Sequence, residues 1–234
     1  MDFLNEGLLK LEFDKGNFFG IPLREFNDLK EKLNSYIKLL QEYNAKFDLI
    51  NTDDYDEIVI RHILDSLSAA KFVAANAKVF LDKGEKNLVL ADIGSGAGLP
   101  GIPLSLAFPS LNFILVERMT KRCDFLNSCK NELSISNCAV EENQVERLEQ
   151  NRFNICVFRA FRPLEKKMVK VLRRILKPEG KLLAYKAKSE KIEEEMNLLE
   201  KNKPEYRVEK LEVPFLTENS ISEIRERNLV IIEK

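Results

Sequence analysis

Residues 92–101 read Asp-Ile-Gly-Ser-Gly-Ala-Gly-Leu-Pro-Gly and place an acid and closely spaced glycines directly before an apolar stretch. Glycines allow sharp turns and a close backbone approach to a ligand, and the helix predicted to follow adds its N-terminal dipole. The spacing Gly96-x-Gly98-x-x-Gly101 also matches the dinucleotide fingerprint. The loop alone therefore predicts either NAD(P) or S-adenosylmethionine. Asp92 would hold the loop or meet the cationic amino-acid part of S-adenosylmethionine.

Two further acids follow the next two predicted strands. Glu117 ends the strand-like run 112–117, where a carboxylate suits the ribose diol of either cofactor. Glu146 follows the run 138–141, where the adenine of S-adenosylmethionine would lie. Taken alone, Glu146 would be a surface acid at the start of a helix. Three acids after three successive strands favour S-adenosylmethionine over NAD(P).

Basic residues end the fourth and fifth predicted strands. Arg159 closes the run 155–159 and Lys186 closes 181–186, on the side of an open α/β sheet that binds ligands. The alternatives are a surface ion pair for Arg159 and a general basic stripe for Lys186. Phe161 could stack on a base, although an aromatic residue after a strand more often belongs to the core.

The only histidine, His62, lies three residues before Asp65, so the two share one face of a predicted helix. In the functional interpretation the pair lines a target pocket, with Asp65 orienting the imidazole or stabilising developing positive charge. In the structural one, His62 packs between helix and core while Asp65 pairs with Arg61.

Alternating strand-like and helical runs must position these residues. The predicted strands are 87–93, 112–117, 138–141, 155–159 and 181–186, with helices near 102–108, 119–133 and 164–176. This alternation predicts a parallel sheet with helices on both faces. Two last strand-like runs, 206–213 and 228–233, predict an antiparallel pair at one edge.

Two amphipathic helical stretches precede this alternation. Apolar residues recur three or four apart from Pro22 to Tyr43, with the proline in the first turn, and a second helix is predicted over about 54–75. The charged turn 82–86 marks a boundary. We therefore expect an α/β protein with an N-terminal helical extension over 1–84 and a core over 85–234.

Composition limits the class of protein. The 234 residues include no apolar run of membrane-spanning length, and the N-terminus lacks the features of a secretory signal. Four cysteines without a CxxC pair, beside a single histidine, argue against a zinc site or a disulfide framework. We expect a cytoplasmic, monomeric protein with reduced thiols and no metal.

The formal net charge of -1 conceals a basic segment. Residues 152–191 carry 13 basic and 3 acidic side chains, a net charge of +10, whereas residues 192–234 carry 7 basic and 11 acidic ones. This segment could supply a face that neutralises phosphates, or simply the solvated side of an amphipathic helix.

Several of these motifs resemble the RsmG (GidB) family. The resemblance rests on Arg-His-Ile-Leu-Asp-Ser-Leu at 61–67 upstream of Asp-Ile-Gly-Ser-Gly-Ala-Gly-Leu-Pro-Gly-Ile-Pro-Leu at 92–104, and extends from about residue 40 to 232. Further matches are Lys121-Arg122, Phe125-Leu126, Val145-Glu146, Arg159-Ala160-Phe161 and Lys186. It implies the seven-stranded Rossmann-like methyltransferase sheet, S-adenosylmethionine as cofactor, and methylation of guanine N7 in 16S ribosomal RNA or the small ribosomal subunit.

The resemblance also assigns residues. It implies cofactor contacts at Gly94, Leu99, Val145, Glu146 and Arg159, to which the loop argument adds Gly96, Gly98 and Glu117. His62, Asp65 and Lys186 match positions near the catalytic and RNA-facing pocket.

The chain departs from the family pattern at four places. Tyr43 replaces the usual Trp, Asp48-Leu49-Ile50 an Asn-Leu-Thr run, Ala187 a glycine, and Glu233 a lysine. Asp48 loses the donor of Asn, and Glu233 weakens the basic character of the last strand. None of these exchanges lies in the glycine loop.

The implied reaction fits what the sequence lacks. Guanine N7 carries a lone pair and no proton, so the enzyme needs no general base and acts mainly by positioning. The segment 157–163 lacks both the Asn/Asp-Pro-Pro-aromatic signature of amine methyltransferases and a Pro-Cys nucleophile. Two other functions stay open: an RNA-binding protein that has lost catalysis, and an NAD(P) oxidoreductase.

Overall fold

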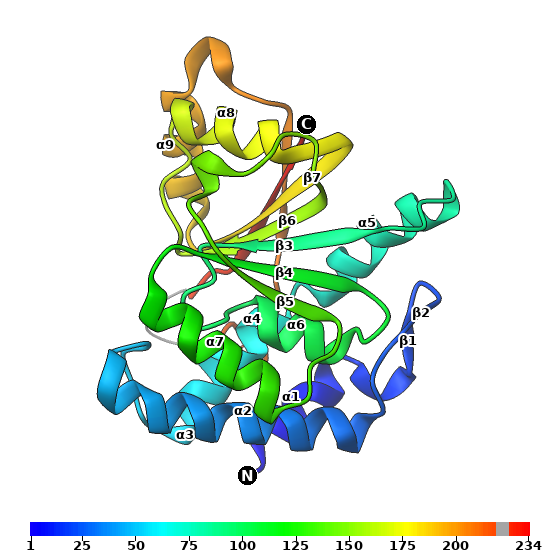
Figure 1. The fold of residues 1–234 in the computed structure, drawn as a ribbon, viewed down its shortest axis with the longest axis vertical. Coiled ribbons are helices and arrows are strands. Elements are labelled where there is room, and N and C mark those ends of the chain that lie inside the picture. Colours follow the sequence, from blue (N-terminus) through cyan, green and yellow to red (C-terminus); the bar gives the residue numbers. More distant parts are fainter. Residues whose placement is uncertain (219–224) are drawn as a thin grey trace.

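A seven-stranded sheet forms the centre of the computed structural model, which describes residues 1–218 and 225–234 (Figure 1). Its strands lie in the order β5-β4-β3-β6-β7-β9-β8. They are β3 (Val89–Ile93), β4 (Asn112–Glu117), β5 (Cys138–Glu142), β6 (Phe153–Arg159), β7 (Leu176–Lys186), β8 (Tyr206–Lys210) and β9 (Asn228–Glu233). The first five are parallel, and β9 pairs antiparallel with both β7 and β8. The predicted α/β class is confirmed.

The central strands β3 and β6 are neighbours in the sheet although β4 and β5 separate them in sequence. Both are almost continuously buried, as expected for parallel strands covered on two faces. The strand order reverses at this pair, and open α/β sheets bind ligands at the carboxyl ends of strands at such a point.

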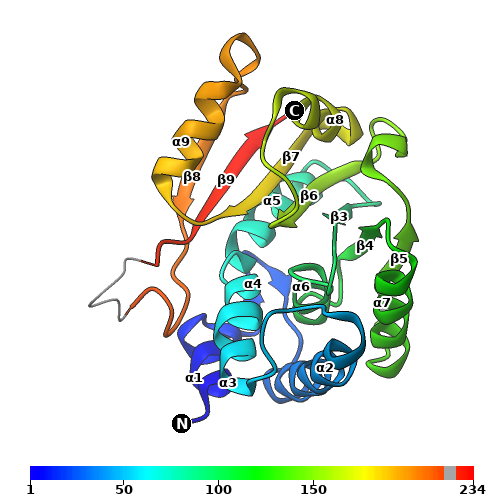
Figure 2. The same ribbon diagram turned by 90° about the vertical axis from the view of Figure 1, so that its left-hand side faces the viewer.

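Helices cover both faces of the sheet (Figures 1 and 2). One face carries α2 (Phe26–Phe47), α5 (Ala70–Asp82), α6 (Gly101–Ala107) and α7 (Thr120–Glu132). The other carries α8 (Lys166–Ile175) and α9 (Ser189–Leu198). Neighbouring strand residues divide between the two layers, because successive side chains of a strand point to opposite faces: Leu183 joins the first core and Leu182 the second.

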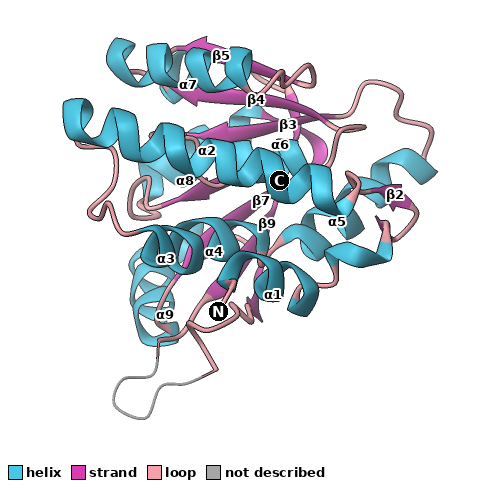
Figure 3. Cartoon of the chain, turned by 90° about the horizontal axis from the view of Figure 1, so that it is seen from below, coloured by secondary structure: helices cyan, strands magenta, loops and turns pink. Residues whose placement is uncertain are grey.

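The N-terminal elements belong to the first layer (Figure 3). Besides α2, they are α1 (Phe3–Lys10), the hairpin β1 (Asn17–Phe18) with β2 (Ile21–Pro22), α3 (Tyr55–Ile58) and α4 (Asp65–Leu67). Leu8 and Leu40 share one hydrophobic cluster with Ile155 and Ile231 of the sheet. Helix α5 ends within the predicted boundary turn, but the division into units 1–84 and 85–234 stays a prediction.

The second predicted helix, over about 54–75, is confirmed as helical except for a break at residues 68–69, but it is not one regular α-helix. The chain passes from α3 through a π-helical turn (Val59–Leu64) into α4, and α5 starts anew at Ala70. Ser66 and Ser68 donate their hydroxyls to the carbonyls of His62 and Asp65, which offers this backbone an alternative to regular helix.

Other boundaries also differ from prediction. Helix α2 begins at Phe26, where Glu25 caps the amide of Asp28, so Pro22 lies in β2 and not in a first turn. Helices α1 and α9 were not predicted. Three short 3-10 turns, Phe13–Lys15, Val145–Arg147 and Glu200–Asn202, complete the described elements.

No helix of the described ranges has the length and apolarity needed to cross a bilayer. The four cysteines, Cys123, Cys129, Cys138 and Cys156, are free and buried. Burial raises the pKa of each thiol, so these groups are protonated and inert at neutral pH.

Candidate active site

Two adjoining pockets open at the carboxyl ends of the parallel strands. The first, here the Glu117 pocket, is lined by Gly94, Val116, Glu117, Arg118, Met119, Arg122, Asn143, Gln144, Val145, Glu146, Ala160, Phe161 and Arg162. The second, here the His62 pocket, is lined by Asn51, Arg61, His62, Asp65, Phe158, Arg159, Ala160, Phe161, Arg162, Pro163, Tyr185, Lys186, Ala187 and Arg227. Residues 160–162 line both pockets, so the two pockets adjoin along this segment.

The glycine loop after β3 adopts a backbone that requires glycine. Gly94, Gly96 and Gly98 have φ of +69°, +58° and +87°. At Gly94 a Cβ would also lie 2.1 Å from Cδ2 of Phe161. Around Gly96 the nearest atoms to such a Cβ are 3.8 Å away, which leaves this part of the loop open to a ligand.

Asp92 fixes the glycine loop by hydrogen bonds to two of its residues. Its Oδ2 accepts hydrogen bonds from Ser95 Oγ at 2.7 Å and from the Gly101 amide at 2.9 Å. Of the two roles predicted for Asp92, this geometry supports the first. Complete burial raises its pKa to about 6, and Oδ1 has no hydrogen-bond partner within the described chain.

Glu117 faces the loop from the end of β4. Its Oε2 accepts from the Gly96 amide at 2.9 Å, and its Oε1 from the amides of Arg118 and Met119 at 2.7 and 2.9 Å. These bonds fix the carboxylate at the floor of the pocket. Because a carboxylate offers about four lone-pair positions and three are occupied here, Glu117 retains acceptor capacity for one ribose hydroxyl.

The remainder of the Glu117 pocket combines apolar and charged groups. Val145 is buried, whereas Met119 is 46% exposed, and both supply apolar lining. Glu146 forms an ion pair with Arg162 at 3.0 Å. A nucleoside needs an acceptor for its ribose hydroxyls and an apolar surface for its base. This pocket offers both, so it fits S-adenosylmethionine.

The predicted cofactor residues do not all lie in this pocket. Gly94, Glu117, Val145 and Glu146 line it, and Gly96 is joined to it through its bond to Glu117. Gly98 and Leu99 pack against the core instead. A Cβ on Gly98 would meet Ile102 and Leu126, and Leu99 is only 6% exposed. Arg159 lies in the His62 pocket.

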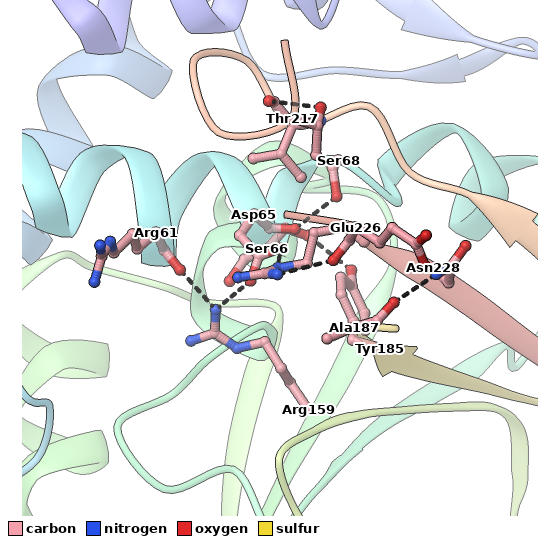
Figure 4. A network of polar contacts seen from close by, with 12 residues as sticks. Arg61, Asp65, Ser66, Ser68, Arg159, Tyr185, Ala187, Thr217, Glu226 and Asn228 are labelled. Atoms are coloured by element: carbon pink, nitrogen blue, oxygen red, sulfur yellow. Dashed lines mark hydrogen bonds and ion pairs between the residues drawn. The ribbon is translucent and has the colours of Figure 1, made fainter. Parts of the chain in front are cut away.

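Arg159 lies in the His62 pocket and contacts Arg61 and Asp65 there (Figure 4). Its guanidinium donates to Asp65 Oδ2 at 2.8 Å and to the Arg61 carbonyl at 3.1 Å, and lies 3.2 Å from His62 Nδ1. Arginine has donors only, so Nδ1 must accept and the imidazole proton must lie on Nε2. Burial, with Arg159 and Arg61 nearby, lowers the pKa of His62 to about 4.

Asp65 lies between two arginines. Besides Arg159, Nε of Arg227 forms an ion pair with Asp65 Oδ1 at 3.2 Å, although not in hydrogen-bond geometry. Arg61 pairs with Glu57 at 3.7 Å, so the predicted alternative of an Arg61–Asp65 pair is not formed. The charge of Asp65 is thus already compensated, which suits a positioning role better than direct stabilisation of a cationic guanine.

Lys186 completes the predicted set. It ends β7, lines the His62 pocket and forms an ion pair with Glu195 of α9 at 2.6 Å. The fold therefore brings His62, Asp65, Lys186 and Arg159 into one pocket from a π-helical turn, α4, β7 and β6.

Among the lining residues that the sequence analysis missed are Met119, Tyr185 and Arg227. Met119 lies two residues after Glu117. Tyr185, which donates its hydroxyl to the Ser66 carbonyl at 2.7 Å, precedes Lys186. Arg227 precedes the antiparallel strand β9, whose start lies at the carboxyl edge of the parallel strands. The antiparallel pairing, which the sequence did predict, is the signal that could have identified Arg227.

Comparisons with known proteins show which family this chain resembles. The chain matches the family described as rRNA small subunit methyltransferase G (GidB) over residues 29–230. It is 39% identical to the ribosomal RNA small subunit methyltransferase G of Treponema denticola, covering 100% of this chain and 96% of that protein. It is 36% identical to that of Xylella fastidiosa, covering 99% and 100%.

Solved structures share the fold at low sequence identity. An S-adenosylmethionine-dependent methyltransferase from Aquifex aeolicus has a TM-score of 0.52 at 17% identity, covering 85% of this chain and 97% of that one. An O-methyltransferase from Thermotoga maritima has a TM-score of 0.50 at 12% identity, covering 83% and 71%.

Proposed function

The chain belongs to the rRNA small subunit methyltransferase G family, and we propose that its two pockets together methylate guanine N7 in 16S ribosomal RNA with S-adenosylmethionine as donor. The observation that carries the proposal is the junction at residues 160–162. There a pocket that fits a nucleoside cofactor meets a pocket lined by a neutral histidine and arginines.

S-adenosylmethionine supplies an electrophilic methyl group on its sulfonium when it is bound. In the Glu117 pocket, the carboxylate of Glu117 would bind the ribose, Met119 and Val145 would line the adenine side, and Gly94 and Gly96 would allow the backbone to approach. Glu146 and its partner Arg162 border the adenine side. These assignments make Glu117 the main polar contact of the chain with the cofactor.

The His62 pocket suits the N7 edge of guanine. This edge presents two acceptors, N7 and O6. His62 offers an Nε2–H donor, because Arg159 occupies Nδ1, and we assign that donor to O6 so that N7 is oriented toward the methyl group. With a pKa of about 4, His62 is a poor base, which agrees with a nucleophile that has no proton to lose.

Asp65 and Lys186 act on position in this scheme. Asp65 holds Arg159 against His62, and Lys186, anchored by Glu195, contacts the RNA at the rim of the same pocket. The rate enhancement then comes from orientation and from a fixed electrostatic environment. We further propose that the protein acts as a monomer in the cytoplasm, where it meets ribosomal RNA or the small ribosomal subunit.

The deciding experiment compares 16S ribosomal RNA from a deletion strain and its parent by chemical cleavage at 7-methylguanosine. We expect one cleavage to disappear on deletion and to return with the wild-type gene but not with Glu117→Ala. An identical cleavage pattern in all strains would remove the proposal.

Calorimetry tests the cofactor assignment separately. We expect the wild-type protein to bind S-adenosylmethionine and not NAD, and Glu117→Ala to weaken binding at least tenfold. Arg159→Ala distinguishes two roles: a cofactor contact lowers affinity for S-adenosylmethionine, whereas a role confined to the His62 pocket leaves affinity intact and lowers methyl transfer.

A further inference from the structure

The structure divides the basic side chains of residues 152–191 into two groups. Seven of the 13 form ion pairs, namely Arg152, Arg159, Arg162, Lys177, Lys181, Lys186 and Lys191. Five others lie together on α8 and form no ion pair with any described residue: Lys166, Lys167, Lys170, Arg173 and Arg174. The positive charge that remains available is therefore concentrated on one helix.

Helix α8 borders a groove to which three more cations contribute. Lys201 and Lys203 come from the end of the α9 region and Lys234 from the end of β9. Figures 1 and 2 both show the C-terminus beside α8. All lining side chains of this α8 groove are basic except Val169. The three added lysines belong to a segment that carries more acids than bases, so counting along the sequence could not assign them here.

The partners of these cations are neutral. Lys203 Nζ lies 3.3 Å from Asn197 Oδ1, Arg174 donates to the Glu146 carbonyl at 3.1 Å, and Lys234 bonds Asn151 and the Leu176 carbonyl. Nε of Arg173 is buried and has no hydrogen-bond partner in the described part of the chain. Like charges gathered in this way repel one another, and a polyanion removes that repulsion.

We propose that the α8 groove binds the phosphate backbone of the substrate RNA, outside the pocket that holds the target guanine. This inference rests on the proposed function. Helix α8 begins four residues after Arg162, which lines both pockets, and its ten residues span about 15 Å. RNA whose guanine enters the His62 pocket can therefore continue along α8.

A lipid surface fits the groove less well. A membrane-bound helix needs an exposed apolar face, whereas Met168, Leu172 and Ile175 of α8 are buried against the sheet. The exposed side of α8 offers cations alone. Such a surface suits a phosphate chain, whose binding depends on charge and not on sequence.

The test neutralises three exposed cations, Lys166→Gln, Lys170→Gln and Lys203→Gln, in one variant of the full chain. The matched control, Lys15→Gln, Lys38→Gln and Lys78→Gln, makes the same charge change on the opposite layer, where Lys15 and Lys78 form exposed ion pairs of little energetic weight. The probe is small-subunit RNA from the deletion strain, titrated over a series of KCl concentrations, with S-adenosylmethionine calorimetry as a check of folding.

We expect the groove variant to reduce the slope of log affinity against log salt by about 2, because each lost phosphate contact removes about 0.7–0.9. The control should keep the wild-type slope, and both should bind S-adenosylmethionine as the wild type does. Equal RNA slopes in groove variant and wild type would overturn the proposal. If the groove variant then also lost binding to phosphatidylserine vesicles, the groove would be a lipid-binding surface instead. Because the assay measures binding, absence of 7-methylguanosine formation would refute the proposed function without altering this result.

Discussion

At the scale of single residues, Arg159 fixes the tautomer of the only histidine. It donates toward Nδ1 of His62, and burial together with this cation lowers the pKa of the imidazole to about 4. His62 therefore stays neutral across the physiological range. Its chemistry is that of a fixed hydrogen-bond donor and not of an acid–base group.

This assignment predicts the pH profile of the reaction. We expect kcat/KM for RNA methylation to be independent of His62 ionisation between pH 6 and 8, and to fall only as pH approaches about 4, where protonation removes the acceptor for Arg159. His62→Ala should lower kcat/KM by about 10–100-fold, since a lost buried hydrogen bond costs about 1–3 kcal/mol. An inflection near pH 6.5 in the wild type that disappears in His62→Ala would contradict the scheme.

Asp92 makes the free energy of unfolding depend on pH. Burial raises its pKa to about 6 from 3.8, so the carboxyl group stabilises the folded state fully below pH 3.8. That contribution is lost as pH rises through about 6. The two-unit difference corresponds to an upper limit of about 3 kcal/mol.

Asp92→Asn removes this titration while retaining an oxygen that can accept from Ser95 and Gly101. Urea unfolding at pH 5, 6 and 8 should show the wild type losing free energy of unfolding relative to Asp92→Asn as pH rises. Parallel pH dependences for the two proteins would show that Asp92 does not titrate in this range.

At the scale of elements, the N-terminal helix α2 supports the cofactor loop. Tyr36 is fully buried and donates its hydroxyl to the Ala97 carbonyl at 2.5 Å. The loop is thus held by Asp92 of its own strand and by a helix about sixty residues earlier. We therefore expect the helical extension to support cofactor binding through the glycine loop.

Tyr36→Phe tests this support. Removal of the hydroxyl leaves the buried Ala97 carbonyl without this partner, and we expect the free energy of unfolding to fall by about 1–3 kcal/mol and S-adenosylmethionine affinity to fall several-fold. Tyr43→Phe is the control, because its hydroxyl makes a longer, partly buried bond to Ser128 at 3.3 Å. Equal effects of the two changes on cofactor affinity would argue against a specific role of Tyr36.

The departures from the family pattern also act at this scale. Asp48 ends α2 in the left-handed region with φ of +49°, a conformation that Asn and Asp tolerate better than most residues. The turn after it is held by Asn44, whose Oδ1 accepts from the amides of Leu49 and Ile50 at 2.8 Å. The side chain of Asn44, and not that of Asp48, therefore caps this turn.

At the scale of the whole molecule, one hydrophobic core joins the N-terminal segment to the sheet. Leu4, Leu33 and Ile63 lie in the same cluster as Leu90 and Val157. Without residues 1–84, that face of the sheet would lose α2 and α5 and expose apolar side chains to water.

Expression of residues 85–234 alone tests whether the predicted core is an independent unit. We expect this fragment to aggregate or to lack a cooperative unfolding transition by circular dichroism, and co-expression with residues 1–84 to restore soluble protein. A monomeric fragment with a sharp transition would show instead that the sheet folds by itself.

The amino-acid sequence of this protein determined much of its fold and part of its site. Runs of apolar residues ending in Asp92, Glu117 and Arg159 predicted the parallel sheet and its ligand-binding edge, because strand periodicity and glycine geometry are local properties. The acids after successive strands indicated Glu117 and Glu146 as cofactor residues, and the family resemblance added Gly94 and Val145. All four line the Glu117 pocket.

Only the tertiary structure separated the two pockets. It placed Arg159 beside His62, packed Gly98 and Leu99 against the core, and brought Arg227 from the far end of the chain to Asp65. It also determined which cations of the basic segment form no ion pair with a described acid. Hydrogen bonds and ion pairs act over a few ångströms between residues that can be more than a hundred positions apart, so residue order alone does not specify them.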